Sequence, residues 1–323
     1  MRIWAVSDVH ADYKENMEWC EALSENAYQE DTLILAGDIS DDQAILRSTF
    51  ELMVRKFEHV FFVPGNHDLW VRRKERGVLD SLGKLEVIKD LCRELGVHTE
   101  PARIGGVWIA PIYSWYHASF DREPDLRGAP AVEKVMVDFH ACRWPPSIPT
   151  SHDTSIAEYF DNLNEPALSN LAENLEMEEE ENGTRSPLIT FSHFLPLQAL
   201  LPEKRMLFQP NLAKAVGSDY IQRRIEELRP IAHIFGHTHF AWDTVVDGVR
   251  YVQWPLAYPQ ERQRRHDGGK GFKPLVIYDT AQKKLSPHQH TYWANFYQEN
   301  RRDPSNIEPA PWVKARLGDL AWK

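Results

Sequence analysis

Near its beginning the chain reads Arg2-Ile3-Trp4-Ala5-Val6-Ser7-Asp8-Val9-His10, an apolar run that passes directly into a polar motif. The apolar residues predict a buried β-strand, and Asp8 and His10 follow at the point where this strand would end. Being two positions apart, these two side chains can point the same way. The arrangement occurs twice more: residues 32–36 lead into Gly37-Asp38, and residues 60–63 lead into Gly65-Asn66-His67-Asp68.

Helix-compatible stretches at about residues 14–28 and 42–57 separate these three strands. The alternation of strands and helices predicts a parallel sheet with right-handed crossovers. The carboxyl ends of parallel strands share one edge of the sheet, where open α/β sheets bind their ligands. We therefore expect the three polar motifs to converge. A mostly helical segment at residues 70–95 should follow, with Gly96 as its end.

The second half of the chain is richer in strands and adds two histidine motifs. Extended segments are predicted at residues 107–111, 188–191, 231–235, 241–246, 249–254 and 272–278. Val246-Asp247-Gly248-Val249 has the composition of a hairpin turn. Two strands run into Ser192-His193 and Gly236-His237-Thr238-His239. The segment 114–186, rich in Trp, Pro, Asp and Glu, is the least regular part of the chain.

Composition excludes several classes of protein. Of 323 residues, 42% are hydrophobic and 26% charged, which is ordinary for a globular protein. The net charge of −11 counts against a non-specific nucleic-acid binder. Cys20, Cys92 and Cys142 lie far apart without a CxxC spacing, so neither a disulfide framework nor a thiolate metal site is expected. With no apolar run of the ~18 residues that span a bilayer and no signal-peptide pattern, we expect a cytoplasmic protein without a membrane partner.

Together the five polar motifs supply oxygen and nitrogen donors of the kind that bind metal ions. They contain two aspartates, one asparagine and four histidines, apart from His67 and Asp68. This mixed set suits Mn, Fe, Zn or Co better than Ca or a thiolate-bound metal. Gly37 and Gly65 would let the backbone turn sharply where the side chains converge.

In order and content, the five motifs resemble the pattern of the calcineurin-like metallophosphoesterases: D-x-H, G-D, G-N-H-[DE], an isolated H and G-H-x-H. The resemblance extends from Asp8 to His239. It implies an α/β fold, a four-layer sandwich of two mixed β-sheets flanked by helices. It also implies two divalent metal ions, with Mn expected and Fe or Zn as alternatives. One ion would be held by Asp8, His10, Asp38 and His239, and the other by Asp38, Asn66, His193 and His237.

The resemblance also implies a mechanism. A hydroxide that bridges the two metal ions would attack phosphorus in line. His67 would lie near the leaving oxygen as proton donor or transition-state stabiliser. Asp41 matches a family aspartate that orients this histidine, and Asp68 is the competing candidate for that role.

Departures from the family pattern narrow the substrate. Protein serine/threonine phosphatases of this superfamily carry G-D-x-x-D-R-G and G-N-H-E, whereas this chain has Asp42 in place of the arginine and Asp68 in place of the glutamate. We therefore expect a small phosphorylated substrate, hydrolysed by a phosphomonoesterase or a phosphodiesterase. Arg72 and Arg73 are candidates for binding its phosphate. Residues 113–117 and 255–262 are candidate walls of its pocket, whereas the basic residues between 262 and 273 fit an exposed loop better than an anion site.

We expect residues 1–290 to form a single metallophosphoesterase domain, with 114–186 as a rim or partial lid of the site. Residues 291–323 should form a C-terminal tail packed on this domain. Two other functions are weighed against the phosphoesterase. A nuclease of the same superfamily would share the ligands but is disfavoured by the acidic charge. A non-catalytic interaction module should lack ligands or the acid histidine, and this chain keeps them all. The natural substrate and the oligomeric state are left open.

Overall fold

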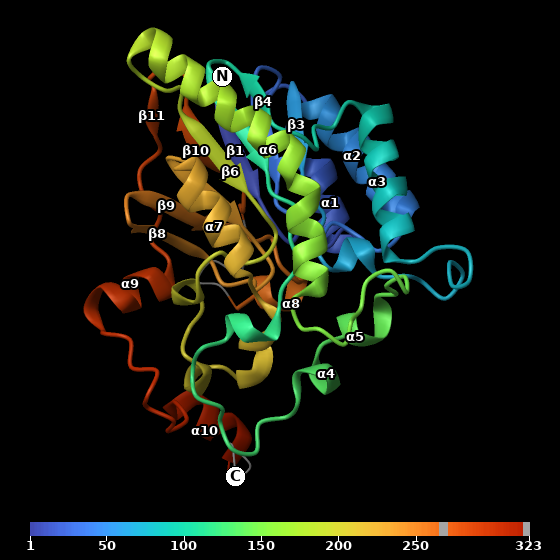
Figure 1. The fold of residues 1–323 in the computed structure, drawn as a ribbon, viewed down its shortest axis with the longest axis vertical. Helices are drawn as coiled ribbons and strands as arrows, with labels where there is room; N and C mark the ends of the chain where they lie inside the picture. Colours follow the sequence, from blue (N-terminus) through green and yellow to red (C-terminus); the bar gives the residue numbers. More distant parts are fainter. Residues whose placement is uncertain (265–270, 319–323) are drawn as a thin grey trace.

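Two β-sheets face each other in the computed structural model, which describes residues 1–264 and 271–318. Helices lie outside both sheets, so the molecule has the helix–sheet–sheet–helix layering expected from the sequence (Figure 1). Phe61 of the first sheet and Phe191 of the second meet edge to face across the shared core, with ring centroids 6.5 Å apart.

The first sheet has the strand order β11-β10-β1-β2-β3. Its strands are β1 (Arg2–Val6), β2 (Thr32–Leu35), β3 (His59–Phe62), β10 (Leu275–Asp279) and β11 (Lys284–Leu285). The first three are parallel, with Ile3 opposite Thr32 and Thr32 opposite His59, as their alternation with helices predicted. β10 pairs antiparallel with β1, which makes the sheet mixed.

The second sheet has the order β4-β5-β6-β7-β9-β8 and is also mixed. Its strands are β4 (Ala102–Ile104), β5 (Val107–Pro111), β6 (Leu188–Phe191), β7 (Ala232–Phe235), β8 (Trp242–Val246) and β9 (Val249–Gln253). β5, β6, β7 and β9 are parallel, whereas β4 and β8 are antiparallel edge strands. The predicted hairpin joins β8 to β9, and Asp247 and Gly248 both adopt the positive φ of its two-residue turn.

The helices divide between the two sheets. The described α-helices are α1 (Lys14–Ala22), α2 (Gln43–Lys56), α3 (Ser81–Leu95), α4 (Val132–Val135), α5 (Asp138–Ala141), α6 (Ser155–Asn182), α7 (Asp219–Leu228), α8 (Pro259–Arg262), α9 (Tyr292–Glu299) and α10 (Pro311–Leu317). Short 3-10 helices are η1 (His67–Leu69), η2 (Ala118–Phe120), η3 (Gln198–Leu200), η4 (Lys204–Met206) and η5 (Pro210–Ala215). α1, α2 and α3 lie together beside the first sheet, and α6 and α7 lie over the second (Figure 1).

Helix boundaries follow local capping. α2 begins where predicted because the Asp42 carboxylate accepts the backbone N–H groups of Ala44 and Ile45. α1 ends earlier than predicted, since the Ser24 hydroxyl bonds the N–H groups of Asn26 and Ala27 and turns the chain. α3 starts only at Ser81, after a run of turns, and ends at Gly96 with φ +74° as expected.

The segment 114–186 is more regular than its composition suggested. It contains α6, a helix of 28 residues with Pro166 in its interior. The acidic run at 176–181 is the exposed end of this helix, and Gly183 with φ +69° terminates it. Leu168, Leu171 and Leu175 bury its other face, so core packing holds a helix that a proline would otherwise weaken.

The C-terminal region packs on the rest of the chain. Ala310 and Val313 form a small apolar cluster with Met206, and the Trp312 indole donates to the Met206 carbonyl oxygen over 3.0 Å. No helix within the described ranges is both long and apolar enough to cross a bilayer.

Candidate metal centre

The five sequence motifs meet where the strands of the two sheets end, and backbone hydrogen bonds join their loops. Asp8 N–H donates to the Gly37 carbonyl over 3.1 Å, and His10 N–H to the Asp38 carbonyl over 2.9 Å. Gly236 N–H donates to the His193 carbonyl over 2.9 Å. These contacts connect the loop after β1 to the loop after β2, and the loop after β6 to the loop after β7.

Five of the seven predicted ligands adopt a backbone conformation that side chains rarely take. The φ angles are +52° at Asp8, +44° at His10, +57° at Asp38, +77° at His237 and +58° at His239. Each such residue costs roughly 1–3 kcal/mol and persists where the surrounding structure enforces it, typically at functional sites. Such concentrated strain on one cluster indicates that its side-chain placement is under functional constraint.

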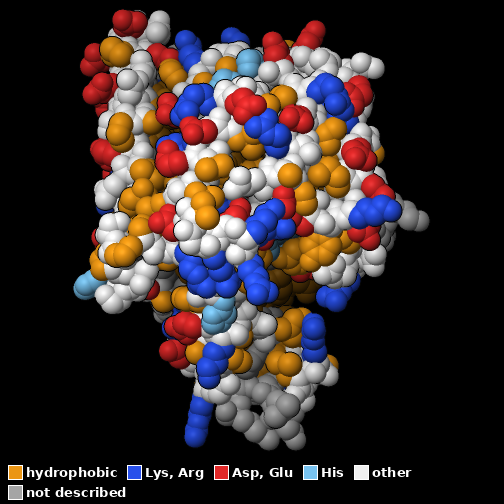
Figure 2. All heavy atoms as spheres, turned by 90° about the vertical axis from the view of Figure 1, so that its right-hand side faces the viewer, with side chains coloured by type: hydrophobic (Ala, Val, Ile, Leu, Met, Phe, Trp, Pro, Cys, Tyr) orange, Lys and Arg blue, Asp and Glu red, His pale blue; other side chains and the backbone are white. Residues whose placement is uncertain are grey.

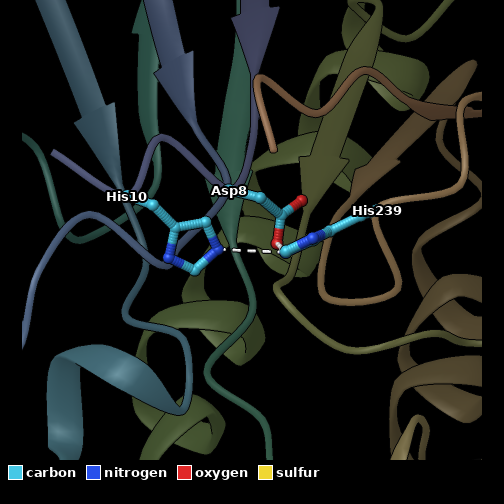
Figure 3. Close-up of side chains that lie close together, drawn as sticks. All are labelled: Asp8, His10 and His239. Atoms are coloured by element: carbon cyan, nitrogen blue, oxygen red, sulfur yellow. Dashed lines mark hydrogen bonds and ion pairs between the residues drawn. The ribbon is translucent and has the colours of Figure 1, made fainter. Parts of the chain in front are cut away.

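Asp8, His10 and His239 form the first half of the centre (Figure 3). The Nε2 atoms of His10 and His239 face each other at 3.0 Å, and His239 Nε2 lies 3.6 Å from Asp8 Oδ1. Asp38 Oδ2 lies 3.9 Å from His10 Nε2. Three of the four side chains that the resemblance implied for the first ion therefore form one group, and the fourth, Asp38, lies beside His10.

Asn66, His193 and His237 form the second half. Asn66 Oδ1 lies 3.1 Å from His193 Nε2 and 2.9 Å from His237 Nδ1. Asp38 Oδ1 lies 3.4 Å from His193 Nε2, while Oδ2 faces His10. The two oxygens of Asp38 are thus turned to opposite halves, the geometry of a carboxylate that bridges two ions.

Outer hydrogen bonds leave the correct ring nitrogens available. His193 Nδ1 lies 2.9 Å from the Ala36 carbonyl oxygen, and His237 Nε2 lies 2.8 Å from that of Ala215. His239 Nδ1 lies 2.7 Å from Glu261 Oε2. In each ring the nitrogen beside the oxygen acts as the donor, so the other nitrogen presents a lone pair to the centre. This donor set fits two divalent cations.

The pKa shifts of these side chains agree with a site for two divalent cations. Burial opposes the charge on Asp38, but His193 and His67 outweigh it and hold the pKa of this carboxyl well below its ordinary value. Burial lowers the pKa of His237 to about 3 and, with His67 and His239, lowers that of His10. Burial also disfavours a charged His193, but the Asp38 carboxylate raises its pKa to about 9, so a cation at Nε2 would replace a proton.

His67 lies at the open edge of the centre. Its ring stacks on Trp70 with centroids 3.6 Å apart, and its backbone N–H donates to Asp38 Oδ1 over 2.9 Å. His67 Nε2 lies 3.4 Å from the Tyr258 hydroxyl and 3.8 Å from Asp38 Oδ2. The side chain remains 16% exposed. It can therefore reach a substrate while its ring is held by Trp70.

The two aspartates considered as partners of His67 make other contacts. Asp41 Oδ1 accepts from Arg72 over 2.5 Å, and no hydrogen bond or ion pair joins Asp41 to His67 among the described residues. The orienting role of Asp41 stays a prediction. Asp68 accepts the backbone N–H groups of Gly65, Asp38, Ile39 and Ser40, at 2.8–3.0 Å. It thereby shapes the loops that carry Asp38 and Asn66.

Three residues of the site were not singled out from the sequence. Asp138, which is 2% exposed, accepts from Asn66 Nδ2 at 2.8 Å, Trp70 Nε1 at 2.6 Å and Tyr116 Oη at 3.1 Å. Glu261 and Tyr258 lie in the loop 255–262, which was predicted only as a pocket wall. No sequence motif pointed to Asp138. For Tyr258 and Glu261, the position of the loop 255–262 directly after β9 indicated that they could reach the site.

The candidate phosphate-binding arginines lie beside the centre in different settings. Arg72 is held by Asp41, by Asp42 at 3.0 Å and by Asp12 at 3.6 Å. Arg73 is exposed and lines a groove of about 640 Å³. The loop between η1 and α3 carries both arginines. Figure 2 shows lysine and arginine side chains gathered beside a hollow on the face where this loop lies. Of the basic residues between 262 and 273, Arg265 and Lys270 lie outside the described residues.

A model of the calcineurin-like phosphoesterase family matches residues 1–241 of the chain. The chain belongs to this family. It is a metal-dependent hydrolase of phosphoric ester bonds, and the fold is the family's pair of mixed sheets flanked by helices. The family and the fold expected from the motifs are thereby confirmed.

Two curated relatives and one solved structure are similar to the chain. [Acyl-carrier-protein] phosphodiesterase PptH of Mycobacterium tuberculosis is 27% identical over 274 residues, covering 81% of this chain and 80% of the relative. Uncharacterized protein L509 of Acanthamoeba polyphaga mimivirus is 21% identical over 292 residues, 86% of this chain and 96% of that protein. The crystal structure of the phosphopantetheinyl hydrolase PptH from M. tuberculosis superposes with a TM-score of 0.63 at 24% identity, covering 82% of this chain and 92% of the other. This likeness supports the fold.

Proposed function

We propose that this enzyme is a phosphodiesterase that hydrolyses the phosphodiester linking a phosphopantetheinyl group to an acyl carrier protein. The named activity of the Mycobacterium tuberculosis relative supports this substrate, since that protein aligns with most of the chain. The substrate is then a small phosphorylated arm carried on a protein, rather than a free metabolite.

The arrangement around Arg72 is the observation that favours a diester as substrate over a monoester. Its guanidinium is held by Asp41 and Asp42, with Asp12 nearby, and Arg72 lines a groove together with Trp70, which stacks on His67. A monoester is a dianion and needs additional positive charge, whereas a diester carries a single charge. Three carboxylates around one arginine offset the charge of Arg72, so this arginine is poorly suited to bind the second negative charge of a dianion.

The residues of the chain have separate tasks in the proposed reaction. Two divalent cations, when bound, neutralise the phosphoryl oxygens and lower the pKa of water. Asp38 holds the two halves of the centre together through its two oxygens. His67 donates the proton from Nε2 to the leaving oxygen, so the serine side chain departs as a neutral alcohol. Trp70 fixes the plane of the His67 ring, and the Tyr258 hydroxyl lies within reach of the same nitrogen.

The identity of the metal, the cellular location and the domain boundaries are also part of this proposal. Mn²⁺ is the expected metal, because nitrogen and oxygen donors are mixed, and Fe or Zn would use the same ligands. A cytoplasmic location agrees with three free, buried cysteines. Residues 1–290 are taken as one domain, with 114–186 at the rim of the site and 291–323 packed on its surface.

A comparison of esters tests the proposal. The protein is stripped with a chelator, refilled with Mn, Zn or Mg, and assayed on bis-p-nitrophenyl phosphate and p-nitrophenyl phosphate. We expect metal-dependent turnover with a preference for the diester. With a phosphopantetheinyl acyl carrier protein, mass spectrometry should show loss of the entire phosphopantetheinyl group. Preference for the monoester, or cleavage of single-stranded DNA instead, would contradict the proposal.

A further inference from the structure

A large cavity adjoins the metal centre at His239, and His67 is not among its lining residues. It has a volume of about 1250 Å³, and His239 and Glu261 belong to its wall. Pockets for small ligands typically measure about 300–1,000 Å³. The cavity therefore has room for a ligand longer than a phosphate with a small ester group, and its end at His239 places the ligand's phosphate at the centre.

The wall of this cavity is largely apolar and includes several aromatic rings. Phe240 meets Trp293 at 6.1 Å between ring centroids, and Trp254 stacks on Phe272 at 5.9 Å. These rings come from four separate segments: the loop after β7, the start of α9, the end of β9 and the approach to β10. Flat apolar walls favour an uncharged, elongated group and offer it hydrophobic contact over its length.

Positive charge is concentrated at the same cavity. Arg264, Lys273 and Arg316 contribute to the lining, and among the described lining residues only Glu261, which is bonded to His239, carries a carboxylate. In a protein with a net charge of −11, such a surface attracts an anionic group locally. A ligand with a phosphate at one end and an uncharged body fits both properties.

The position of the cavity also indicates which ester bond is broken. His10 contacts both His67 and His239, with ring centroids 4.7 Å from the first and 4.9 Å from the second. The proton donor His67 marks the side of the leaving group. The cavity is lined by His239 but not by His67 or His10, so a substituent in it lies away from the proton donor and stays attached to phosphorus.

We propose that the cavity beyond His239 binds the long arm of the diester, so that the arm leaves still bearing its phosphate. This assignment rests on the proposed diesterase function and adds a binding site to it. The occupant is an elongated amide-linked chain of the phosphopantetheine type. Water adds to phosphorus, the bond from phosphorus to the carrier serine oxygen breaks, and that oxygen takes the proton from His67.

Two diesters with the same leaving group test the assignment. Methyl p-nitrophenyl phosphate and the p-nitrophenyl diester of phosphopantetheine differ only in the group predicted to occupy the cavity. We expect kcat/KM to be at least about tenfold higher for the diester with the arm, because its remote contacts bind the substrate. Equal kcat/KM values for the two diesters would overturn the assignment.

Cavity variants give an independent test. Trp293→Ala removes part of the wall, and Leu212→Trp fills part of the space. Each variant should reduce the preference for the arm, measured as the ratio of kcat/KM for the two diesters, at least about fivefold. Turnover of the methyl diester should stay at the native level, which also shows that the variant folds. Met177→Ala, an exposed apolar position on α6 outside the cavity, should change neither value.

The outcomes separate the two proposals. A preference for the arm that both variants leave intact would overturn the cavity assignment alone. If neither diester is hydrolysed while p-nitrophenyl phosphate is, the diesterase proposal fails, and the cavity assignment fails with it.

Discussion

The buried carboxylate of Asp138 accepts a 2.8 Å hydrogen bond from the amide nitrogen of Asn66. This bond directs the other atom of the amide, Oδ1, towards His193 and His237. The same carboxylate accepts from the Trp70 indole, and the Trp70 ring stacks on His67. One residue of the 114–186 segment thus positions both a predicted metal ligand and the proposed proton donor.

Replacing Asp138 should weaken metal binding. In Asp138→Ala the Asn66 amide loses its acceptor, and partners of this kind typically contribute about 10–100-fold to metal affinity. Asp138→Asn retains an acceptor oxygen and should recover part of the loss. Calorimetric titration of the chelated protein with Mn²⁺ measures the effect. Glu133→Ala, an exposed acid of the same segment, is the control, and native affinity in Asp138→Ala would contradict the role.

This relationship changes the expected result of deleting the 114–186 segment. A simple rim or lid could be removed with loss of substrate preference alone. Because Asp138 and Tyr116 belong to the segment and Asp138 bonds Asn66, deletion should also lower metal content. Metal analysis of the deletion protein alongside Asp138→Ala checks this, provided that circular dichroism shows both to be folded.

His67→Ala should slow hydrolysis without releasing metal. Loss of a general acid typically costs about 10²–10⁴-fold in kcat. The loss should be large for a diester with an alkyl alcohol as leaving group and small for p-nitrophenol, which departs without a proton. Steady-state rates for the two leaving groups in native and His67→Ala protein give the comparison. An equal loss for both would argue against proton donation.

Gly65 must lack a side chain for the centre to form. A Cβ at this position would collide with the Asp38 carboxylate and with the His193 ring, which lies 2.7 Å away at Cε1 and Nε2. Gly65→Ala should therefore lose bound metal and diesterase activity together. Gly83→Ala, within α3, is a matched control because its Cβ meets only Leu79 Cδ2 at 3.3 Å and Asp80 Oδ1 at 3.5 Å. Retention of two metal ions by Gly65→Ala would refute the close packing.

His233 should make the fold sensitive to acid. Burial lowers its pKa from 6.5 to about 3, while its ring nitrogens bond Thr190 and Ser192. Between pH 6.5 and 3 the unfolded chain binds a proton that the folded chain does not, so stability falls as pH falls, by up to about 1.4 kcal/mol per unit.

Above this window His233 has no effect on the pH dependence. His233→Gln should abolish its share of the slope, so the loss of stability between pH 6.5 and 5 becomes about 1.6 kcal/mol smaller. Urea unfolding of both chelated proteins at these two pH values provides the measurement. Identical losses in native and variant protein would show that His233 is not the sensitive group.

Much of the centre could be predicted because its ligands directly follow strands. Asp8, Asp38 and His237 occupy short motifs after buried apolar runs, and parallel strand order brings such positions to one edge. The right-handed crossovers and the facing mixed sheets then follow from topology and the family resemblance.

The residues that were missed reach the site through tertiary structure. Asp138 lies 72 positions after Asn66 in a segment without motif or regular pattern, and only the packing of α5 brings them together. Arg72 looked available for phosphate in sequence, yet the fold surrounds it with Asp12, Asp41 and Asp42. The acidic end of helix α6 was expected from the sequence, but its full length was not, because Pro166 and the mixed composition hide an apolar face that burial stabilises.

The most direct test of the two-cation centre is a titration of the chelated protein with Mn²⁺, following turnover of bis-p-nitrophenyl phosphate against metal bound per chain. If Asp38 bridges two ions, activity should rise with the second equivalent, and Asp38→Asn should stay inactive throughout. Full turnover in the chelated protein, or a plateau at one equivalent, would contradict the account.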